Sequence, residues 1–254
     1  MRSPFRNVTA FLAMVTRCSS SRRVILSFHY DMVDSTMTEV ERLKTHVNIP
    51  FCVSADVQTS GSGRGTNNWL SPKGGLWFSL CLHYDHTVPS FALYVGAQIH
   101  QVLTRLFPKI SSELKIKWTN DIYWKDQKLA GILCKYYSAE NLYSIGIGIN
   151  TNNSLDSSLQ AINAINLKKC IGAPISNTNL KQILCRSIIN LQELGTAEYI
   201  SYCNLHLYGA GKHVKVDMGN STISGSIHQI NPDGALSIKT ENGTQDIYSG
   251  SLQF

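Results

Sequence analysis

Apolar and polar positions along this chain recur with two different periods, which predict a set of short strands and three helices. Between 89 and 107, apolar side chains return every three or four positions, the spacing of a helix with one buried face. Residues 180–194 repeat this pattern behind asparagines suited to a helix N-terminus. A third, more polar helix is expected to begin near Asp34–Thr36 and to end before Pro50, because proline interrupts helices.

Short runs between these helices have the composition of β-strands, rich in valine, isoleucine and aromatic residues. Turn sequences at 125–127 and 138–141 link three of the runs as hairpins. Two stretches, 59–68 and 151–176, are polar and irregular, and we expect them to be loops. We expect strands at 24–30, 51–58, 75–83, 114–118, 121–124, 128–137 and 142–150.

The pattern changes after Gly209, where short strands and turn residues alternate closely. Several short strands within about fifty residues are typical of a small barrel. We therefore divide the chain into a basic extension at 1–23 that is expected to be disordered, a catalytic domain at 24–208 and a C-terminal domain at 209–254. The C-terminal strands are expected at 214–216, 224–227, 235–238 and 245–248.

Composition restricts the class of protein. With 254 residues, 43% hydrophobic and 16% charged, the chain has the composition of a folded globular protein, and no apolar run is long enough to cross a bilayer. The net charge of +6 is modest, and no basic run is interleaved with aromatic residues, so we expect no nucleic-acid binding. The seven cysteines are scattered and never form Cys-x-x-Cys, which favours a reducing compartment. We expect a cytoplasmic protein; the acid-free, arginine-rich N-terminus leaves an organellar transit peptide as the alternative.

Polar residues lie on the strands between 114 and 150 in a pattern that strand formation alone does not require. Lys117–Asp121 reads Lys-Trp-Thr-Asn-Asp, and a buried Asn-Asp pair is costly unless it is solvated or used. Asp121 can hold Mg²⁺, and Asn120 can orient a phosphate. Lys128 begins a strand of small and apolar residues, where its amine can either reach solvent or stabilise charge on a substrate oxygen.

Glycines supply the second part of this chemistry. Gly131, Gly146 and Gly148 interrupt strands, which indicates either a bulge or the close approach of a ligand. The loop Gly61–Thr66 carries three glycines around Arg64, so its amides and one guanidinium can converge on an anion. A flexible turn is the alternative, and the loop matches neither a Walker motif nor a dinucleotide fingerprint.

Taken together, these motifs resemble those of the biotin protein ligases, the holocarboxylase synthetase family. The resemblance covers the chain from about residue 24 to its end, and it is specific because the motifs occur jointly and in order. It implies an α+β fold in which a class II synthetase-like mixed sheet is flanked by helices, with a small SH3-like β-barrel at the C-terminus. The matching motifs are Asp34–Thr36, Gln58–Gly65, Trp69–Pro72, Lys117–Asp121, Lys128–Leu133, Gly146–Asn150 and Asp233–Leu236.

The function that the resemblance implies is a two-step ligation. Biotin and Mg-ATP form biotinyl-5′-AMP and pyrophosphate, and the adenylate then acylates a lysine of a biotin carboxyl carrier domain. Lipoate or octanoate ligation is the alternative within the same superfamily. The resemblance leaves a homodimer possible, and we expect no membrane partner and no operator binding, because some thirty residues are too few for a helix-turn-helix domain.

Site residues follow from the resemblance position by position. Arg64 and Lys128 are the expected catalytic cations, and Asp121 is the expected Mg²⁺ ligand. The expected ATP contacts are Arg64, Trp69, Asn120 and Asn150. The expected biotin contacts are Ser35, Thr36, Met37, Gln58, Gly61, Ser62, Gly63, Arg64, Lys128, Gly131, Leu133, Gly146 and Gly148.

Three positions depart from the family pattern. Met37 stands where an asparagine is common, Ser62 where a basic residue is common, and Thr119 where a proline is common. The first two remove polar or charged contacts to the ligand and the third loosens a turn, so we expect an active but slower enzyme.

Overall fold

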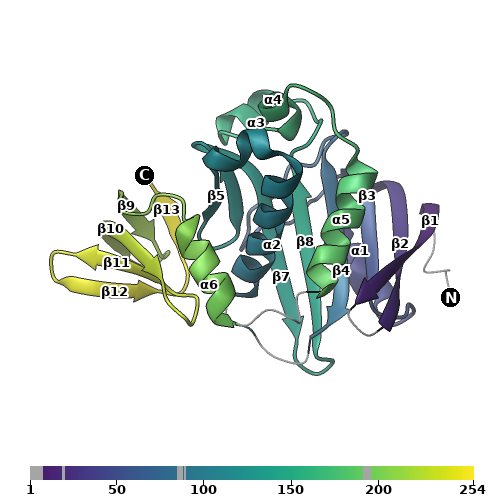
Figure 1. The fold of residues 1–254 in the computed structure, drawn as a ribbon, viewed down its shortest axis with the longest axis horizontal. Coiled ribbons are helices and arrows are strands. Elements are labelled where there is room, and N and C mark those ends of the chain that lie inside the picture. The colour runs from purple at the N-terminus through teal and green to yellow at the C-terminus, as the bar shows by residue number, and fades with distance from the viewer. Residues whose placement is uncertain (1–7, 19–20, 85–87, 89, 191–195) are drawn as a thin grey trace.

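The computed structural model describes residues 8–18, 21–84, 88, 90–190 and 196–254, which form two sheets with helices packed on the larger one (Figure 1). The larger sheet has the strand order β1-β2-β3-β4-β8-β7-β6-β5. Only β2 and β3 are parallel neighbours, so the mixed sheet is confirmed. Its strands are β1 (Val8–Cys18), β2 (Ser21–Val33), β3 (Phe51–Gln58), β4 (Leu76–His83), β5 (Leu114–Lys117), β6 (Asp121–Trp124), β7 (Gln127–Tyr137) and β8 (Leu142–Ile149).

Helices cover both faces of this sheet. α2 and α5 pack against each other over one face, whereas α1 contacts β3, β4 and β8. Among the described residues, no helix is both long enough and apolar enough to span a membrane. The helices are α1 (Thr36–Leu43), α2 (Phe91–Leu106), the 3-10 helix η1 (Pro108–Glu113), α3 (Ser157–Ala161), α4 (Leu167–Ile171), α5 (Asn177–Ile189) and α6 (Thr196–Leu205).

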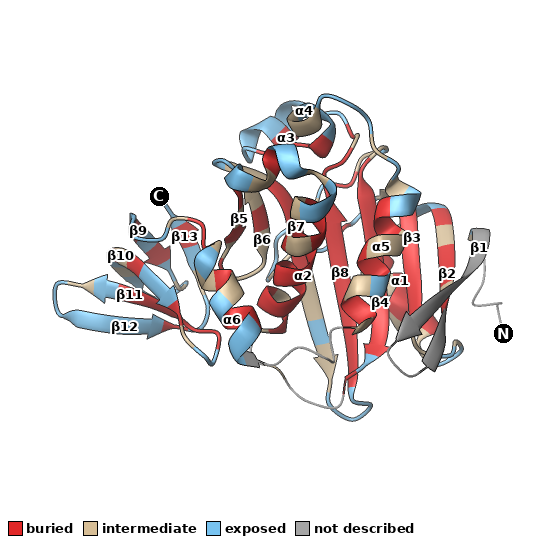
Figure 2. Ribbon diagram, in the orientation of Figure 1, coloured by how far each residue is buried: buried red, intermediate tan, exposed pale blue. Residues whose placement is uncertain are grey.

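The strand β3 shows how the sheet separates two apolar layers. Phe51 and Val53 pack with Val40 and Leu43 of α1. Cys52, between them, belongs to the larger core under α2 and α5, because successive side chains of a strand point to opposite faces. Figure 2 shows this core as buried residues along the central strands and on the inner sides of α2 and α5. The helical period predicted for 89–107 thus corresponds to a buried face.

Several predicted elements have different bounds. The helix predicted at 180–194 is α5, Asn177–Ile189, and residues 191–194 of that prediction lie outside the described residues. Ser35 caps α1 by accepting a hydrogen bond from the Met37 amide, as expected, but the helix ends at Leu43, well before Pro50. The predicted loop 151–176 contains α3 and α4, each only five residues long and capped by an aspartate or an asparagine. Helices this short show no readable apolar period, which is why the sequence pattern did not reveal them.

The N-terminal region differs from the disordered extension expected at 1–23. Val8–Cys18 forms a strand that pairs antiparallel with β2 from Tyr30 back to Ser21. Valine, phenylalanine and threonine in this segment favour a strand, and the edge of β2 supplies the hydrogen-bond partners. Residues 1–7 and 19–20 of the predicted extension lie outside the described residues.

The C-terminal strands form a second, antiparallel sheet with the order β12-β11-β10-β9-β13. The small C-terminal β-domain was therefore predicted correctly, but within the described chain no pairing joins the edge strands β12 and β13 into a closed barrel. Trp118 anchors this sheet to the larger one by donating its indole N–H to the Gly234 carbonyl at 3.0 Å. The strands are β9 (His213–Asp217), β10 (Thr222–Ile230), β11 (Leu236–Thr240), β12 (Gly243–Ile247) and β13 (Ser251–Gln253).

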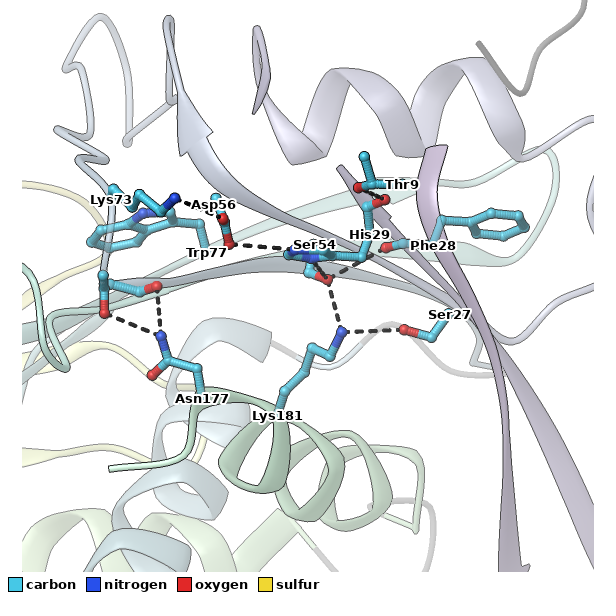
Figure 3. A network of polar contacts seen from close by, with 12 residues as sticks. Thr9, Ser27, Phe28, His29, Ser54, Asp56, Lys73, Trp77, Asn177 and Lys181 are labelled. Atoms are coloured by element: carbon cyan, nitrogen blue, oxygen red, sulfur yellow. Dashed lines mark hydrogen bonds and ion pairs between the residues drawn. The ribbon is translucent and has the colours of Figure 1, made fainter. Parts of the chain in front are cut away.

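A buried lysine ties α5 to β2 and β3 (Figure 3). The Lys181 amine donates to the hydroxyls of Ser54 at 2.8 Å and Ser27 at 3.3 Å. Ser54 also contacts His29 Nδ1 at 3.1 Å, and His29 Nε2 lies 3.3 Å from Asp56. Burial, together with the nearby charge of Lys181, lowers the pKa of His29 below its ordinary value. Hydroxyl groups therefore satisfy this interior ammonium, and a partly exposed histidine and carboxylate extend the network outward.

The packing of α2 yields a direct stability test. Leu103 is fully buried, whereas Leu106 on the same helix is 37% exposed. Leu103→Ala should lower the free energy of unfolding by about 2–5 kcal/mol, because it leaves a cavity in the core. The matched Leu106→Ala control should change it by less than about 1 kcal/mol. Chemical denaturation measures both, and equal losses would contradict the assigned helix face.

Candidate active site

A pocket of about 380 Å³ opens where α1, the loop 59–71, strands β6–β8 and the end of β13 meet. Of the site residues predicted from sequence, all but Gly61 line it. Gly61 lies just outside, where its amide oxygen accepts a hydrogen bond from the Trp69 amide at 2.7 Å and a side chain would collide with the Trp69 carbonyl. The predicted residues on the lining are Ser35, Thr36, Met37, Gln58, Ser62, Gly63, Arg64, Trp69, Asn120, Asp121, Lys128, Gly131, Leu133, Gly146, Gly148 and Asn150.

The floor of the pocket explains two of the strand glycines. Gly131 and Gly148 are directly paired across β7 and β8 in an unbroken register, so neither forms a bulge. The indole of Trp69 lies on both: a Cβ at Gly131 would come within 2.6 Å of the ring, and one at Gly148 would collide with the indole nitrogen. That nitrogen is buried and has no hydrogen-bond partner within the described part of the chain. Glycine is therefore required at both positions because the Trp69 indole packs directly against the backbone there. The N–H of this indole is left without an acceptor among the described residues.

Hydrogen bonds fix the polar end of the pocket beside α1. Gln58 Oε1 accepts from the Thr36 amide at 2.8 Å and from the Thr36 hydroxyl at 3.0 Å. Its amide nitrogen donates to Ser71 Oγ at 2.7 Å, so the Gln58 side chain is held at both ends. Met37 lies against Gly146, where an added Cβ would come within 2.9 Å of the Met37 sulfur. This end is thus rigid, and Met37 contributes an apolar contact to it.

An ion pair joins two of the predicted residues. Lys128 Nζ lies 2.8 Å from Asp121 Oδ2 and 5.1 Å from the centre of the Trp69 ring. The second oxygen of Asp121 is buried and accepts no hydrogen bond from any described residue. β7 positions Lys128 and β6 positions Asp121 on adjacent antiparallel strands. The amine is therefore oriented by the carboxylate, which keeps one free coordinating oxygen.

Two further cations face the pocket, and neither has a carboxylate partner among the residues that the structure describes. Arg64 Nη1 donates to Thr119 Oγ1 at 3.2 Å, and its second amino group donates to the Gly250 carbonyl. Lys117 Nζ donates to the Tyr123 hydroxyl at 3.3 Å and to the Leu252 carbonyl at 3.4 Å. Burial lowers the pKa of Lys117 from its ordinary value; Asp121 opposes this shift, while the Lys128 and Arg64 charges add to it.

Asn120 and Asn150, whose side-chain amides were predicted to contact ATP, form hydrogen bonds within the protein. Asn120 Nδ2 donates to the Ile132 carbonyl at 2.9 Å, which ties the turn between β5 and β6 to β7. Asn150 is buried, and its side-chain oxygen accepts from Asn153 at 3.1 Å. In this arrangement both side chains shape the pocket wall rather than project freely into it.

Several lining residues were not selected from the sequence. Of these, Lys117 had a signal, because it opens the Lys-Trp-Thr-Asn-Asp run. Leu70, Ile132 and Ile147 lie inside motifs quoted above but were not chosen from them, whereas most of the others come from segments that only tertiary structure brings to the pocket. The unselected residues are Asn67, Asn68, Leu70, Lys117, Tyr123, Ile132, Ile147, Leu159, Ile162, Ala164 and Ser251.

Comparisons with known proteins converge on one family. Residues 30–152 match the family model described as the biotin/lipoate A/B protein ligase family, and residues 209–254 match the one described as the biotin protein ligase C terminal domain. The chain is 28% identical over 240 residues to the bifunctional ligase/repressor BirA of Bacillus spizizenii, covering 89% of this chain and 73% of that protein. It is 32% identical over 158 residues to biotin–protein ligase 2 of Arabidopsis thaliana, covering 58% of this chain and 46% of that protein.

Solved structures agree in fold. The biotin protein ligase from Aquifex aeolicus in complex with biotin and ATP superposes with a TM-score of 0.77 at 28% sequence identity, covering 89% of this chain and 97% of that chain. The biotin acetyl coenzyme A carboxylase synthetase of Helicobacter pylori, with bound biotinylated ATP, has a TM-score of 0.66 at 25% identity, covering 87% of this chain and 98% of that one. The match therefore includes most of this chain and nearly all of each of these two chains.

The glycine floor can be tested without any ligand. Gly148→Ala should displace the Trp69 indole, because the new methyl group would occupy the position of the ring nitrogen. The near-ultraviolet circular dichroism of tryptophan should change. Gly96→Ala is the control, since a Cβ there would meet nothing closer than 3.5 Å and should leave that spectrum unaltered. Identical spectra for Gly148→Ala and the wild type would contradict the described packing.

Proposed function

Because the chain belongs to the biotin protein ligase family, we propose that its pocket performs the family's reaction, the ATP-dependent attachment of biotin to a protein lysine. The first family model includes lipoate ligases, but the C-terminal model and the named relatives are those of biotin protein ligases. They favour biotin over lipoate as the substrate. The protein is thus a carbon–nitrogen bond-forming ligase.

One observation supports this chemistry above the others: cations from three strands or loops face one half-enclosed pocket beside a rigid polar end. Biotin carries a carboxylate and ATP a triphosphate, and these groups repel each other. A guanidinium and an amine held between them reduce that repulsion where charge develops in the transition state. Arg64 and Lys128 are the pair that we propose for this position.

The first step joins the two substrates. A carboxylate oxygen of biotin attacks the α-phosphorus of ATP, and the bond from that phosphorus to the pyrophosphate oxygen breaks. The products are biotinyl-5′-AMP and pyrophosphate. In our proposal Lys128 contacts the reacting carboxylate and phosphate oxygens, and Arg64 contacts the α-phosphate. Asp121 keeps the Lys128 amine pointed into the pocket from 2.8 Å away.

The second step transfers the biotinyl group. The neutral amine of a target lysine attacks the acyl carbon, AMP leaves, and the amine loses a proton to form an amide. Until then the adenylate must be kept from water. We propose that the loop around Ser62 and Gly63 covers it and that Trp69, flat on its glycine floor, forms one wall of the biotin channel.

Biotin would lie along the floor with its ring at the rigid end of the pocket. Ser35, Thr36 and Gln58 offer polar groups there for the ureido ring. Met37 makes this end less polar than an asparagine would. The remaining channel residues that we propose for the tail are Gly131, Leu133, Gly146 and Gly148.

Magnesium fits this site through Asp121. Within the described part of the chain, no three His, Cys, Asp or Glu side chains gather into a metal cluster. Mg²⁺ in nucleotide enzymes is commonly held by one or two carboxylates together with substrate phosphates and water. The partner-free oxygen of Asp121 provides such a ligand. When bound, Mg²⁺ would neutralise phosphate charge.

The cellular context remains a set of proposals. We propose a biotin carboxyl carrier domain of a biotin-dependent carboxylase as the acceptor, and a cytoplasmic location, which the six free thiols among the described residues favour. We keep the domain boundary at 208/209, since the second sheet begins at His213. A homodimer stays a prediction.

The decisive experiment combines the wild type with biotin, ATP and a carrier domain. Pyrophosphate release and mass spectrometry of the carrier should show one biotinylated lysine. Lys128→Met should slow pyrophosphate release by about 10²–10³-fold, the cost of removing a charge-stabilising group. Lys135→Met is the control, because Lys135 lies on the same strand, is 59% exposed and pairs with Glu41 outside the pocket.

Three results bear on the proposal. Turnover in Lys135→Met should stay within about twofold of the wild type, as for other surface ion pairs. Normal pyrophosphate release from Lys128→Met would remove Lys128 from the reaction. Turnover of lipoate with no turnover of biotin would reject the proposed substrate.

A further inference from the structure

The charges that line the pocket do not balance. Among the described residues that line it, three are basic (Arg64, Lys117 and Lys128) and one is acidic (Asp121). Asp121 is already paired with Lys128 at 2.8 Å. Two half-buried cations are therefore left with neutral partners, an arrangement that is costly unless an anion binds between them.

Two of the neutral partners come from one short segment: Gly250 just before β13, and Leu252 within it. Arg64 binds the carbonyl of Gly250, and Lys117 binds the carbonyl of Leu252. Carbonyls two residues apart on an extended chain point to the same side. β13 is an edge strand that pairs only with β9, so this side is free of other strands. Two oxygens at the spacing of a strand thus stand in for the phosphoryl oxygens of a polyphosphate.

We propose that Lys117 is the second cation of a polyphosphate subsite, which it forms with Arg64 and which receives the pyrophosphate part of ATP. This inference rests on the proposed ligase function and adds a substrate-binding residue to it. Lys117 would hold the leaving group while Lys128 contacts the reacting atoms. The Tyr123 hydroxyl, 3.3 Å from the amine, keeps Lys117 directed along the pocket wall.

A purely structural role for Lys117 would be to attach the C-terminal sheet, but other contacts already do this. Trp118 donates to the Gly234 carbonyl at 3.0 Å. Asn204 makes two bonds to the main chain of Ile230, at 2.7 and 2.8 Å. These bonds are shorter than the 3.4 Å contact of Lys117. Burial lowers the pKa of Lys117, so the amine is held at a cost that a bound polyanion would offset.

Titration calorimetry of the full-length chain with inorganic pyrophosphate, without biotin or metal, tests the subsite directly. Lys117→Met should weaken binding by at least about tenfold, the value of one charge-assisted hydrogen bond. Lys117→Arg should restore affinity to within about threefold of the wild type. Lys115→Met is the matched control, because Lys115 lies on the same strand but lines a different pocket. It should stay within about twofold.

Kinetics separate this inference from the proposed function. In Lys117→Met, the KM for ATP should rise by at least about tenfold while the KM for biotin stays within about twofold. The inference is overturned if Lys117→Met binds pyrophosphate as the wild type does, if Lys115→Met loses as much affinity, or if Lys117→Arg fails to restore it. A wild type that makes no biotinyl-5′-AMP would instead reject the ligase function, whatever the calorimetry shows.

Discussion

An excess of positive charge in a half-enclosed pocket is the constraint on which this structure depends. Strands β5 and β7 and the glycine loop each bring one cation to the same place, while the lining includes one carboxylate. Such an arrangement is unfavourable in an isolated protein because like charges repel and burial weakens their hydration. It becomes favourable when substrates bring several negative charges. The same imbalance suits the proposed function, because a nucleotide would supply the missing negative charge.

The pocket floor shows how sequence composition creates that enclosure. Two glycines paired across β7 and β8 leave the sheet surface bare, and Trp69 from a distant loop lies flat on it. A strand made only for stability would carry larger side chains there. The sheet gives up apolar packing at this point and gains a narrow channel with an aromatic wall. Rigid hydrogen bonds around Gln58 close its inner end.

Sequence patterns predicted the regular parts of this protein well. Most strands and the long helices α2 and α5 were identified because alternation and helical period persist over many residues, whereas α6 and η1 were not predicted. α3 and α4 were missed because five residues complete little more than one turn. Whether the C-terminal sheet closes, and whether Val8–Cys18 forms a strand, depends on which strand edges pair with each other. Such pairing leaves no local pattern in the sequence.

The residues of the candidate site also fall into those that a sequence motif indicates and those that only the tertiary fold brings to the pocket. Residues inside contiguous motifs, such as Lys128 and Asp121, line the pocket, and their mutual ion pair was not predicted. Ile162 and Ser251 reach the pocket through the tertiary fold alone. Met37 stands where the family pattern commonly has an asparagine, and the structure shows the effect of this difference. Its sulfur fills the space over Gly146, where an asparagine would present an amide.

The free edge of β13 has a consequence for self-association. Unpaired strand edges invite pairing with another chain, and proteins commonly cover or charge them. Here the guanidinium of Arg64 donates to the carbonyl just before that strand, and the amine of Lys117 donates to a carbonyl within it. Positive charges beside a strand edge disfavour its pairing with another chain, so the cations proposed to bind the nucleotide would also oppose edge-to-edge association of the C-terminal sheet.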